Sequence, residues 1–502
     1  MPWVRAENVS ISAMQPVATS PFLGVFETEA GCRTACEANP NCTQYNWISC
    51  GSADRRNHCY GRCDNRWELQ PVPCTVAGRR VAAAAPPPPP RGVMRLHLLQ
   101  DPEALCLDGS PGGFYFAPAT NPVQNYSWHI HIDGGGWCYT LEDCWLRSKE
   151  GLGSSKGWGP FSAGIGGIGS MNCSINPEFC GFNRVFLKYC DGGSQAGYRQ
   201  EPWAGPDGKK VFIRGQRILS AALAALSEDF GMSNAREVLL TGCSAGGAST
   251  YMHADSVGEW LRVLSPTLVK YKAAPVSGFF LQHENVLGQP VYADQMRVAY
   301  QTHNASGGID SGCRTSASAA GEEWRCMLAN YSFPHITTPL FVLNSALDWW
   351  SIMCILTAAP IRPGYQPSPG LEAEGMNGNC TFAGNVPIPE WATCGADPEG
   401  CNAAQISSQI NPWIRSFLAD YSSSGGGGRI GSGAFIHSCN THCEAERDPD
   451  WPAIVVGGVS MRDAVSAWWR SVDSRTAEHM HLPCMYKTSV PHKCNPSCMR
   501  GP

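Results

Sequence analysis

Basic clusters and long apolar runs are both missing from this sequence. Lysine and arginine number 37 against 42 aspartates and glutamates in 502 residues, a formal net charge of −5. Without a basic patch, nothing points to a nucleic acid as partner. No apolar stretch reaches the roughly 18 residues of a membrane span. Residues 1–10 also lack the apolar segment of a signal peptide, which we interpret as an incomplete or trimmed start.

Cysteine, in contrast, is abundant. The 25 cysteines are spread over the whole length and do not form one paired metal motif, so disulfides in an oxidising compartment explain them best. Sequons for N-glycosylation agree with that compartment. We therefore expect a secreted protein, extracellular or in a cell wall, with sequons at Asn8, Asn41, Asn125, Asn172, Asn304, Asn330 and Asn379.

An Ala/Pro-rich segment divides the chain. Five consecutive prolines at residues 86–90 favour polyproline II, which makes residues 81–92 a semi-rigid linker. The preceding residues 1–80 are too few to be stable on a hydrophobic core alone, and disulfides would staple them. The expected domains are this module and residues 93–502, and the module's cysteines are Cys32, Cys36, Cys42, Cys50, Cys59, Cys63 and Cys74.

The most informative motif is GxSxG, formed by Gly242, Ser244 and Gly246. An apolar run at residues 238–241 predicts a buried strand before it, and small residues after it can begin a helix. A tight strand-to-helix turn with small neighbours exposes the central serine as a nucleophile. The alternative is a glycine turn with an incidental serine.

Strands and helices alternate ahead of this motif. Residues 126–133 alternate apolar and polar side chains like a strand, and residues 183–191 form a second strand. Residues 218–230 repeat apolar side chains with helical spacing. This order predicts an α/β fold with a mostly parallel sheet.

Three glycines, residues 134–136, follow the first of these strands. Glycine lets backbone N–H groups approach a reacting atom, as an oxyanion hole requires. A phosphate-binding loop is the competing interpretation, but no GKS/T or GxGxxG pattern follows. A plain turn remains possible, and we expect His129 and His131 to be structural.

The best candidate for an orienting acid is Asp348. It ends the apolar strand predicted at residues 338–348, and acids that orient a catalytic histidine follow strands in such folds. Asp255, Asp294 and Asp310 follow no such strand. A helix-cap or turn aspartate is the alternative role.

The best candidate for a base is His442. Cys443 directly follows it and Cys439 precedes it by three residues, so disulfides would hold this loop still. His437 is the rival. A zinc site of Cys439, His442 and Cys443 is the other alternative, but no CxxC pair or HExxH motif lies nearby. Ser244, Asp348 and His442 follow each other in the α/β-hydrolase order.

Several segments together resemble the plant pectin acetylesterase family, which is related to the Notum-type carboxylesterases. They cover about residues 93–502 and include a cysteine-rich tail at Cys484, Cys494 and Cys498. The segments are 107–110, 132–138, 188–192, 212–217, 240–247, 343–348 and 438–443.

The resemblance implies an α/β-hydrolase-like fold with helices on both faces of a mostly parallel sheet. It implies Ser244 as nucleophile, His442 as base and then acid, and Asp348 as the residue that orients the imidazole. The oxyanion donors would be the N–H groups of Gly135, Gly136 and Ala245. Neither a metal nor an organic cofactor is implied.

Cysteines near the proposed site are the next feature. The resemblance implies a disulfide between Cys138 and Cys144 that fixes the oxyanion loop. Cys243, beside the nucleophile, is the best candidate for an unpaired thiol. A role for Cys243 as the nucleophile is disfavoured, because the elbow exposes Ser244 and buries its neighbour.

The N-terminal module resembles the PAN/apple family in residues 31–47, where two cysteines one turn apart precede a third and an aromatic strand. That resemblance implies a carbohydrate or protein ligand. A disulfide-held spacer without a ligand is the alternative.

Three further parts of the large domain carry expectations. The family usually has an aspartate where this chain has Val276, which puts local hydrogen bonding in doubt. Residues 358–401 are expected to be loops that overhang the site. Trp468 and Trp469 lie on a predicted helix with spacing for burial, so we expect them in the core.

These observations predict a secreted serine O-acetylesterase acting on an acetylated cell-wall polysaccharide, most simply pectin. Two alternatives stand beside it. A Notum-like deacylase of a lipid-modified protein would need a large apolar acyl pocket. A non-catalytic carbohydrate-binding protein would keep the fold with a broken triad, whereas Ser244, Asp348 and His442 are all present.

Overall fold

The computed structural model divides the chain into two compact units, Met1–Pro88 and Pro89–Pro502. It describes residues 3–11, 22–25, 34, 44–48, 58–62, 69–80, 92–360, 385–425, 431–471, 478–480 and 495–498. The boundary between the units falls within residues 81–92, the predicted linker.

The first unit contains a five-stranded antiparallel sheet in the order β1-β5-β3-β4-β2. The side chains of its seven cysteines lie outside the described residues, so the PAN/apple assignment stays a prediction. The strands are β1 Trp3–Ile11, β2 Phe22–Val25, β3 Gln44–Ile48, β4 His58–Arg62 and β5 Leu69–Arg80.

The second unit is built on a ten-stranded sheet in the order β21-β18-β15-β14-β13-β8-β10-β7-β6-β9. From β21 to β10 each neighbouring pair is parallel, and β7, β6 and β9 complete one edge in antiparallel register. The parallel strands are β8 Ser127–Ile132, β10 Asn183–Leu187, β13 Glu237–Cys243, β14 Lys270–Val276, β15 Phe341–Ser345, β18 Gly433–His437 and β21 Glu478–Met480. The edge strands are β6 Met94–Leu98, β7 Gly113–Ala117 and β9 Phe161–Ser162.

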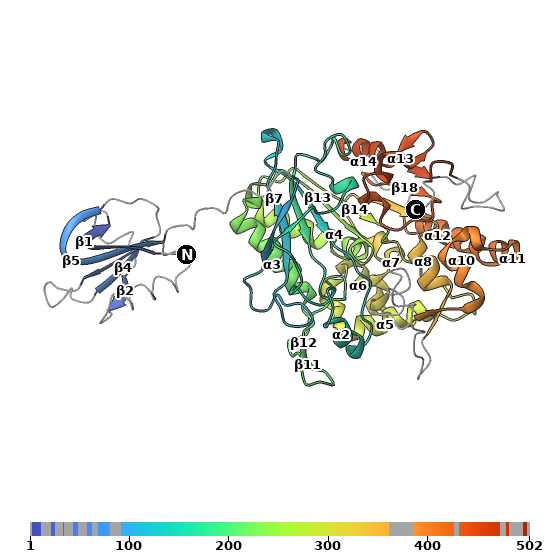
Figure 1. The fold of residues 1–502 in the computed structure, drawn as a ribbon, viewed down its shortest axis with the longest axis horizontal. Helices are drawn as coiled ribbons and strands as arrows, with labels where there is room; N and C mark the ends of the chain where they lie inside the picture. Colours follow the sequence, from blue (N-terminus) through green and yellow to red (C-terminus); the bar gives the residue numbers. More distant parts are fainter. Residues whose placement is uncertain are drawn as a thin grey trace. The chain divides into compact units, whose positions relative to one another are not determined.

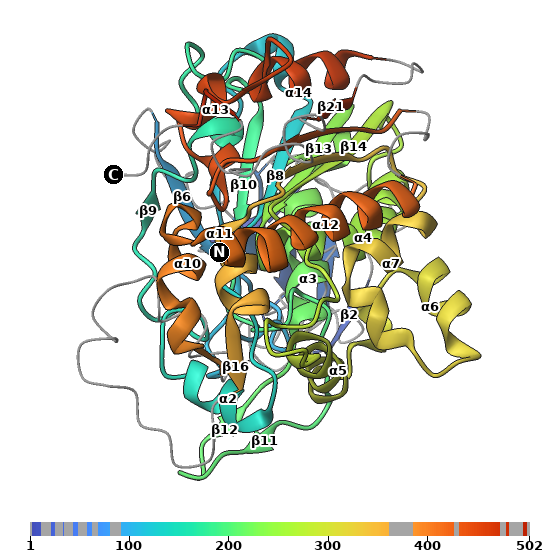
Figure 2. The same cartoon turned by 90° about the vertical axis from the view of Figure 1, so that its right-hand side faces the viewer.

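Helices cover both faces of this sheet, as predicted (Figures 1 and 2). Alternate residues of one strand point to opposite faces, so Leu240 packs in one core cluster and Leu239 in the other. The first cluster includes α3 Gly215–Asp229, α4 Ala245–Leu264 and α12 Asn411–Ser423, and the second includes α14 Met461–Arg470. A parallel sheet buried on both faces is the arrangement that βαβ connections produce.

The strands and the helix predicted around Ser244 are confirmed with shifted ends. The strand expected at residues 126–133 is β8, and the helix expected at 218–230 is α3, which begins three residues earlier at Gly215. The strands expected at 183–191 and 338–348 are shorter, since β10 ends at Leu187 and β15 at Ser345. The polar residues after each strand leave the sheet as loops, where they are free to contribute to a site.

The prediction that Trp468 and Trp469 are buried is confirmed, whereas the prediction that residues 358–401 are loops is wrong in part. Trp468 and Trp469 are buried in the second core cluster, as expected. Residues 358–401 are not all loop, because they contain β16 Ala358–Pro360, β17 Asn385–Pro387 and α10 Ala392–Ala396. Residues 361–384 of that region lie outside the described residues.

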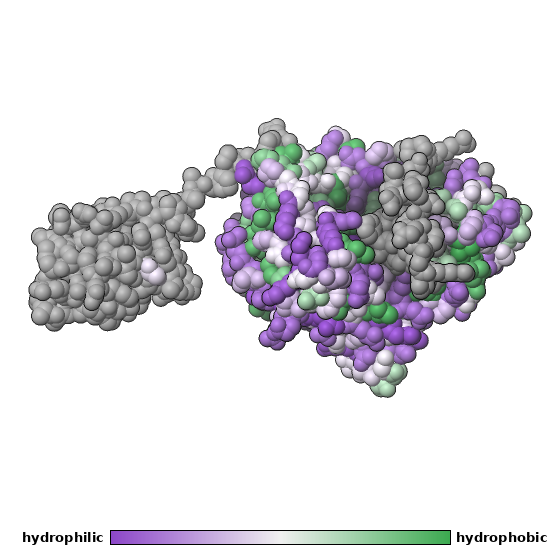
Figure 3. Space-filling model, turned by 60° about the horizontal axis from the view of Figure 1, so that its bottom comes forward, coloured by the Kyte–Doolittle hydropathy of each residue, from purple (hydrophilic) through white to green (hydrophobic). Residues whose placement is uncertain are grey.

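Hydrophilic side chains cover most of the described face in Figure 3, with hydrophobic ones in separate patches. Among the described residues, no helix combines the length and apolar character needed to cross a bilayer.

Candidate active site

Ser244 lies at a sharp turn between β13 and α4. Its backbone has φ 59° and ψ −125°, and a positive φ is uncommon for a residue other than glycine. The Ser244 N–H donates to the Val276 carbonyl over 3.1 Å, which ties the turn to the neighbouring strand β14. The predicted strand, turn and helix are therefore present around the serine.

Neighbouring glycines are needed because the backbones approach each other closely here. A Cβ atom at Gly242 would lie 2.3 Å from the Gly246 carbonyl oxygen, and one at Gly246 would lie 2.1 Å from the Ile132 oxygen. A Cβ atom at Gly134 would meet the Cys243 oxygen at 2.3 Å. The GxSxG glycines and the glycine loop after β8 are thus packed against one another at Ser244.

Asp348 and His442 form a buried pair. The His442 Nδ1 donates to Asp348 Oδ2 over 2.6 Å, and the other carboxylate oxygen of Asp348 accepts from the Ser351 N–H. Asp348 is also the N-cap of the short helix α8 Trp349–Ser351, so it makes the helix cap and the contact with His442 at the same time. Both side chains are almost fully buried.

The charge of Asp348 favours the protonated form of His442. Burial lowers the pKa of the imidazole, but the Asp348 carboxylate, with Glu444 and Glu446 farther away, outweighs burial. The pKa of His442 is therefore raised above its ordinary value of 6.5.

Ser244 and His442 line the same cavity, which has a volume of about 190 Å³. Within the described part of the chain, the Nε2 atom of His442 has no hydrogen-bond partner. Because Nδ1 carries the proton donated to Asp348, Nε2 offers a lone pair. The other lining residues are Asp133, Gly134, Gly135, Gly136, Cys243, Trp349, Trp350, Cys443 and Glu446.

Arg147 and Tyr189 hold the glycine loop by its carbonyl groups. Arg147 donates to the Gly135 oxygen over 2.6 Å and to the Trp137 oxygen over 3.0 Å, while the Tyr189 hydroxyl donates to the Gly136 oxygen over 2.6 Å. In contrast, the N–H groups of Gly135 and Gly136 have no partner among the residues described here.

The N–H of Ala245 is the third predicted oxyanion donor. As the first residue of α4 it has no carbonyl one turn earlier in the helix. The structure thus gathers Gly135, Gly136 and Ala245 around Ser244.

Sequence reasoning did not identify Arg147. Its signal was the helix α2 Leu141–Arg147, which starts at a Thr140–Asp143 capping box and places Arg147 one turn after Cys144. Cys144 pairs with Cys138, so a disulfide and a buried arginine both fix the glycine loop.

His437 is not at the cavity. It is fully buried and its Nε2 lies 2.8 Å from Glu444 Oε1. Burial raises the pKa of Glu444, but His437 outweighs it and the pKa is lowered overall. His437 and Glu444 therefore form a structural pair beneath the loop that carries His442.

Cys243 is not an unpaired thiol, and that prediction was wrong. It forms a disulfide with Cys443, 200 residues later in the sequence. Cys439 pairs with Cys498, so both cysteines that flank His442 hold its loop, as expected. These pairings leave neither Cys439 nor Cys443 as a thiolate ligand for zinc.

His129 and His131 are structural, as expected. His129 Nε2 and His131 Nδ1 each lie 2.7 Å from the Thr241 hydroxyl on β13, at hydrogen-bond distance. The second ring nitrogen of His131 lies 2.9 Å from Glu446, a cavity residue that the sequence did not reveal.

At Val276, where the family usually has an aspartate, neighbouring groups make the local hydrogen bonds. Val276 is buried, and its carbonyl accepts from Ser244. The next residue, Ser277, has φ 44°, and its hydroxyl accepts from the Cys443 N–H over 3.0 Å. The Val276 carbonyl and the Ser277 hydroxyl thus each accept a hydrogen bond at this position.

Known proteins similar to this chain are named as esterases. A family model described as "Pectinacetylesterase" matches residues 89–368. Pectin acetylesterase 5 of Arabidopsis thaliana is 28% identical over 400 residues, which cover 79% of this chain and 82% of that protein. The human palmitoleoyl-protein carboxylesterase NOTUM is 27% identical over 291 residues, covering 54% of this chain and 55% of that protein.

A solved structure titled as the Wnt deacylase Notum from Drosophila has the same fold. Its TM-score is 0.58 at 21% identity, and the match covers 81% of this chain and 99% of that one.

Proposed function

This chain belongs to the pectinacetylesterase family, and we propose that it is a serine esterase that removes acetyl groups from a cell-wall polysaccharide, with pectin the first candidate. Ester hydrolysis is the activity that its plant and animal relatives share by name. The observation that carries the proposal is that Ser244, His442 and the glycine loop line one and the same cavity.

The proposed first step is attack of the Ser244 oxygen on the ester carbonyl. His442 Nε2 takes the serine proton, while Asp348 keeps Nδ1 protonated and stabilises the imidazolium. The negative oxygen of the tetrahedral intermediate accepts hydrogen bonds from the N–H groups of the glycine loop and of Ala245.

The intermediate then collapses. The bond to the sugar oxygen breaks, His442 returns its proton to that oxygen, and an acetyl group remains on Ser244. In the second half, His442 removes a proton from water, which attacks the acetyl-enzyme. Release of acetate returns the proton to Ser244.

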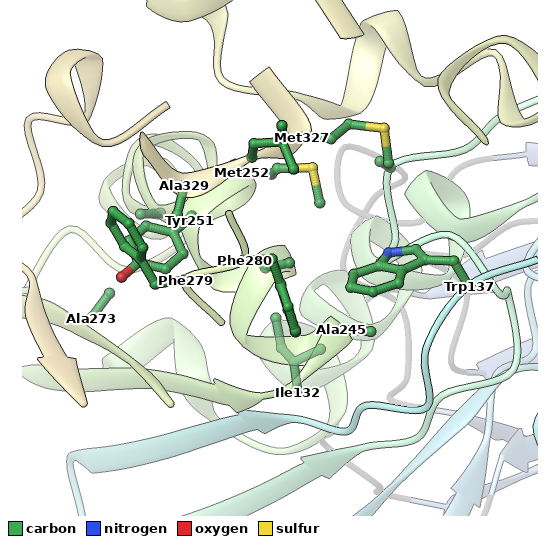
Figure 4. Close-up of a cluster of buried hydrophobic side chains, with 14 of the residues drawn as sticks. Ile132, Trp137, Ala245, Tyr251, Met252, Ala273, Phe279, Phe280, Met327 and Ala329 are labelled. Carbon is green, nitrogen blue, oxygen red and sulfur yellow. The ribbon is translucent and has the colours of Figure 1, made fainter. Parts of the chain in front are cut away.

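The size of the cavity favours a short acyl group. About 190 Å³ is below the roughly 300–1,000 Å³ of pockets that bury larger ligands. Aromatic rings occupy the adjacent space: the Phe280 ring lies 5.1 Å from those of both Trp137 and Trp350. Figure 4 shows Phe280 and Trp137 beside Ala245. A long acyl chain would need these rings to move.

The setting of the enzyme is part of the proposal. Disulfides join seven pairs of described cysteines, which supports an oxidising, extracellular location. For the unit Met1–Pro88 we propose a carbohydrate or protein ligand, on the PAN/apple resemblance.

The test is acetate release from acetylated pectin, with acetylated xylan and a long-chain model ester in parallel. Ser244→Ala should abolish release. Ser249→Ala is the matched control, because Ser249 is buried on the same helix, does not line the cavity and has a hydroxyl without a hydrogen-bond partner among the described residues.

Three results would count against parts of the proposal. Release that survives Ser244→Ala would overturn the mechanism. Activity confined to the long-chain ester would point to a lipid deacylase, and no activity on any ester would point to a binding protein.

A further inference from the structure

A disulfide links the residues directly beside the proposed nucleophile and base. Cys243 precedes Ser244 at the end of β13, and Cys443 follows His442, 200 residues later. Both sulfur atoms lie within 4.8 Å of a ring nitrogen of His442. The bridge therefore covalently ties the elbow to the histidine loop at the point where their side chains must meet.

The backbone around this bridge adopts unfavourable conformations. Ser244, Ser277 and Cys443 all have positive φ, at 59°, 44° and 59°. Residues other than glycine keep such a conformation only when their surroundings fix it. Here Ser244 donates to the Val276 oxygen, and Cys443 donates to the Ser277 hydroxyl.

The bridge is also reachable through the cavity. Cys243 is buried, but Cys443 is half-buried, and both cysteines line the cavity. Three other disulfides at the core of the unit, Cys106–Cys190, Cys138–Cys144 and Cys313–Cys326, are buried at both ends. A small thiol that enters the cavity can attack Cys443 Sγ.

We propose that the Cys243–Cys443 disulfide positions Ser244 and His442 for reaction, and that a dithiol reductant switches the enzyme to a low-activity form by opening it. The proposal rests on the proposed function and adds a means of control at the same site. It makes the esterase dependent on the oxidising environment in which its disulfides form.

The chemistry balances as a thiol–disulfide exchange. A thiolate of the reductant attacks Cys443 Sγ, the sulfur–sulfur bond breaks, and Cys243 leaves as a thiolate that takes up a proton. The second thiol of the reductant then attacks the mixed disulfide, releasing the Cys443 thiol and closing the reductant's own disulfide. Two electrons pass from the dithiol to the protein.

The test compares wild type with Cys243→Ala/Cys443→Ala, and uses Cys394→Ala/Cys401→Ala as the matched control. The control bridge also pairs a buried with a half-buried cysteine, but it does not line the cavity. For each oxidised protein, kcat and KM for acetate release and the rate and amplitude of labelling by a fluorophosphonate are measured. The amplitude counts folded sites and the rate reports how well each site is arranged.

In the Cys243/Cys443 variant we expect kcat and the labelling rate to fall about 10- to 100-fold, because a displacement of about 1 Å can cost about 100-fold. KM and the labelling amplitude should change little. The Cys394/Cys401 variant should keep wild-type rates. Dithiothreitol should lower the wild type to the level of the Cys243/Cys443 variant without slowing that variant further, and reoxidation should restore the wild type.

Several results would overturn the proposal. Unchanged rates in the variant would do so, as would a lower amplitude whose remaining sites react at the wild-type rate, since the bridge would then serve stability alone. An equal loss in the control variant would also do so. If oxidised wild type neither releases acetate nor reacts with the probe, the proposed function itself fails, and this proposal with it.

Discussion

His442 donates from Nδ1 to Asp348 over 2.6 Å, although the two residues are 94 positions apart in the sequence. Asp348 follows β15 and His442 follows β18, and these strands are parallel neighbours in the sheet. Their carboxyl ends therefore deliver both loops to the same place. Since the second oxygen of Asp348 is bound by Ser351, the carboxylate cannot turn away from the imidazole.

The first prediction concerns Asp348→Asn and the pH dependence of kcat. His442 must be neutral to act as base, so activity rises as pH increases through its pKa. In the wild type that pKa is raised above 6.5 mainly by the Asp348 charge, so the acid limb of the profile lies above pH 6.5. Without the charge, burial dominates and the limb should move to lower pH.

The maximum rate should fall at the same time, by about 10,000-fold, because an amide favours the wrong tautomer of the histidine. Steady-state rates between pH 5 and 9 check both effects. The same acid limb in wild type and variant would show that Asp348 does not control the base.

Much of this site was predictable because its signals are local. The strand before Ser244, the small residues around it and the glycine loop are each contained in about ten consecutive residues. Asp348 was found in the same way, as the polar residue that ends an apolar strand. The mostly parallel sheet followed from the alternation of strand and helix patterns.

What the sequence did not reveal depends on contacts between distant residues. The partner of Cys243 was invisible because 200 residues separate it from Cys443. Arg147 and Glu446 were missed for the same reason, since only the folded chain places Arg147 under the glycine loop and Glu446 beside His131. The sequence could not show which of His437 and His442 lies beside Ser244, whereas the structure places His442 alone of the two at the cavity.

The second prediction separates the two histidines by substitution with glutamine. His437→Gln leaves the buried Glu444 carboxylate with only the neutral hydroxyl groups of Thr441 and Ser277 and no imidazole, and should lower the free energy of unfolding by about 3–5 kcal/mol. The folded fraction should retain most of its kcat. Thermal unfolding and active-site labelling on the same samples measure the two effects.

For His442→Gln the pattern should reverse. This variant should lose kcat by several orders of magnitude with a smaller change in stability, because it removes the proposed base. A large loss of kcat in the folded fraction of His437→Gln would contradict the assignment of His437 as structural.

The third prediction concerns Arg147, which holds the carbonyls of Gly135 and Trp137 with two hydrogen bonds. Lysine keeps the charge but cannot form both bonds in the same fork geometry. Arg147→Lys should therefore loosen the glycine loop and lower kcat by about 10- to 100-fold, less than the loss of a proposed oxyanion donor itself.

The control for this change is Arg214→Lys. Arg214 is equally buried and also donates to a backbone carbonyl, but that of Gln200, which lies outside the glycine loop. Equal losses of kcat in the two variants would show that the Arg147 effect is not specific to the loop. Measuring kcat at saturating substrate separates the effect from binding.

The last prediction tests whether aromatic side chains limit the acyl group. Phe280 is buried between Trp137 and Trp350, and the Trp350 ring stacks on His442 at 6.4 Å. Phe280→Ala should open space beside the reacting carbonyl and raise kcat/KM for butyrate and longer esters relative to acetate. The substitution should also cost about 3–5 kcal/mol of stability.

Phe279→Ala is the matched control, because Phe279 is equally buried but packs against Tyr251, Phe417 and Tyr421 (Figure 4 shows both phenylalanines). It loses the same side-chain volume and should be destabilised by a similar amount, while keeping the wild-type preference for acetyl esters. Rates on a series of model esters of increasing chain length provide the comparison. If both variants keep the wild-type preference, the Phe280 ring does not set the acyl length, and the cavity beside Ser244 is bounded elsewhere.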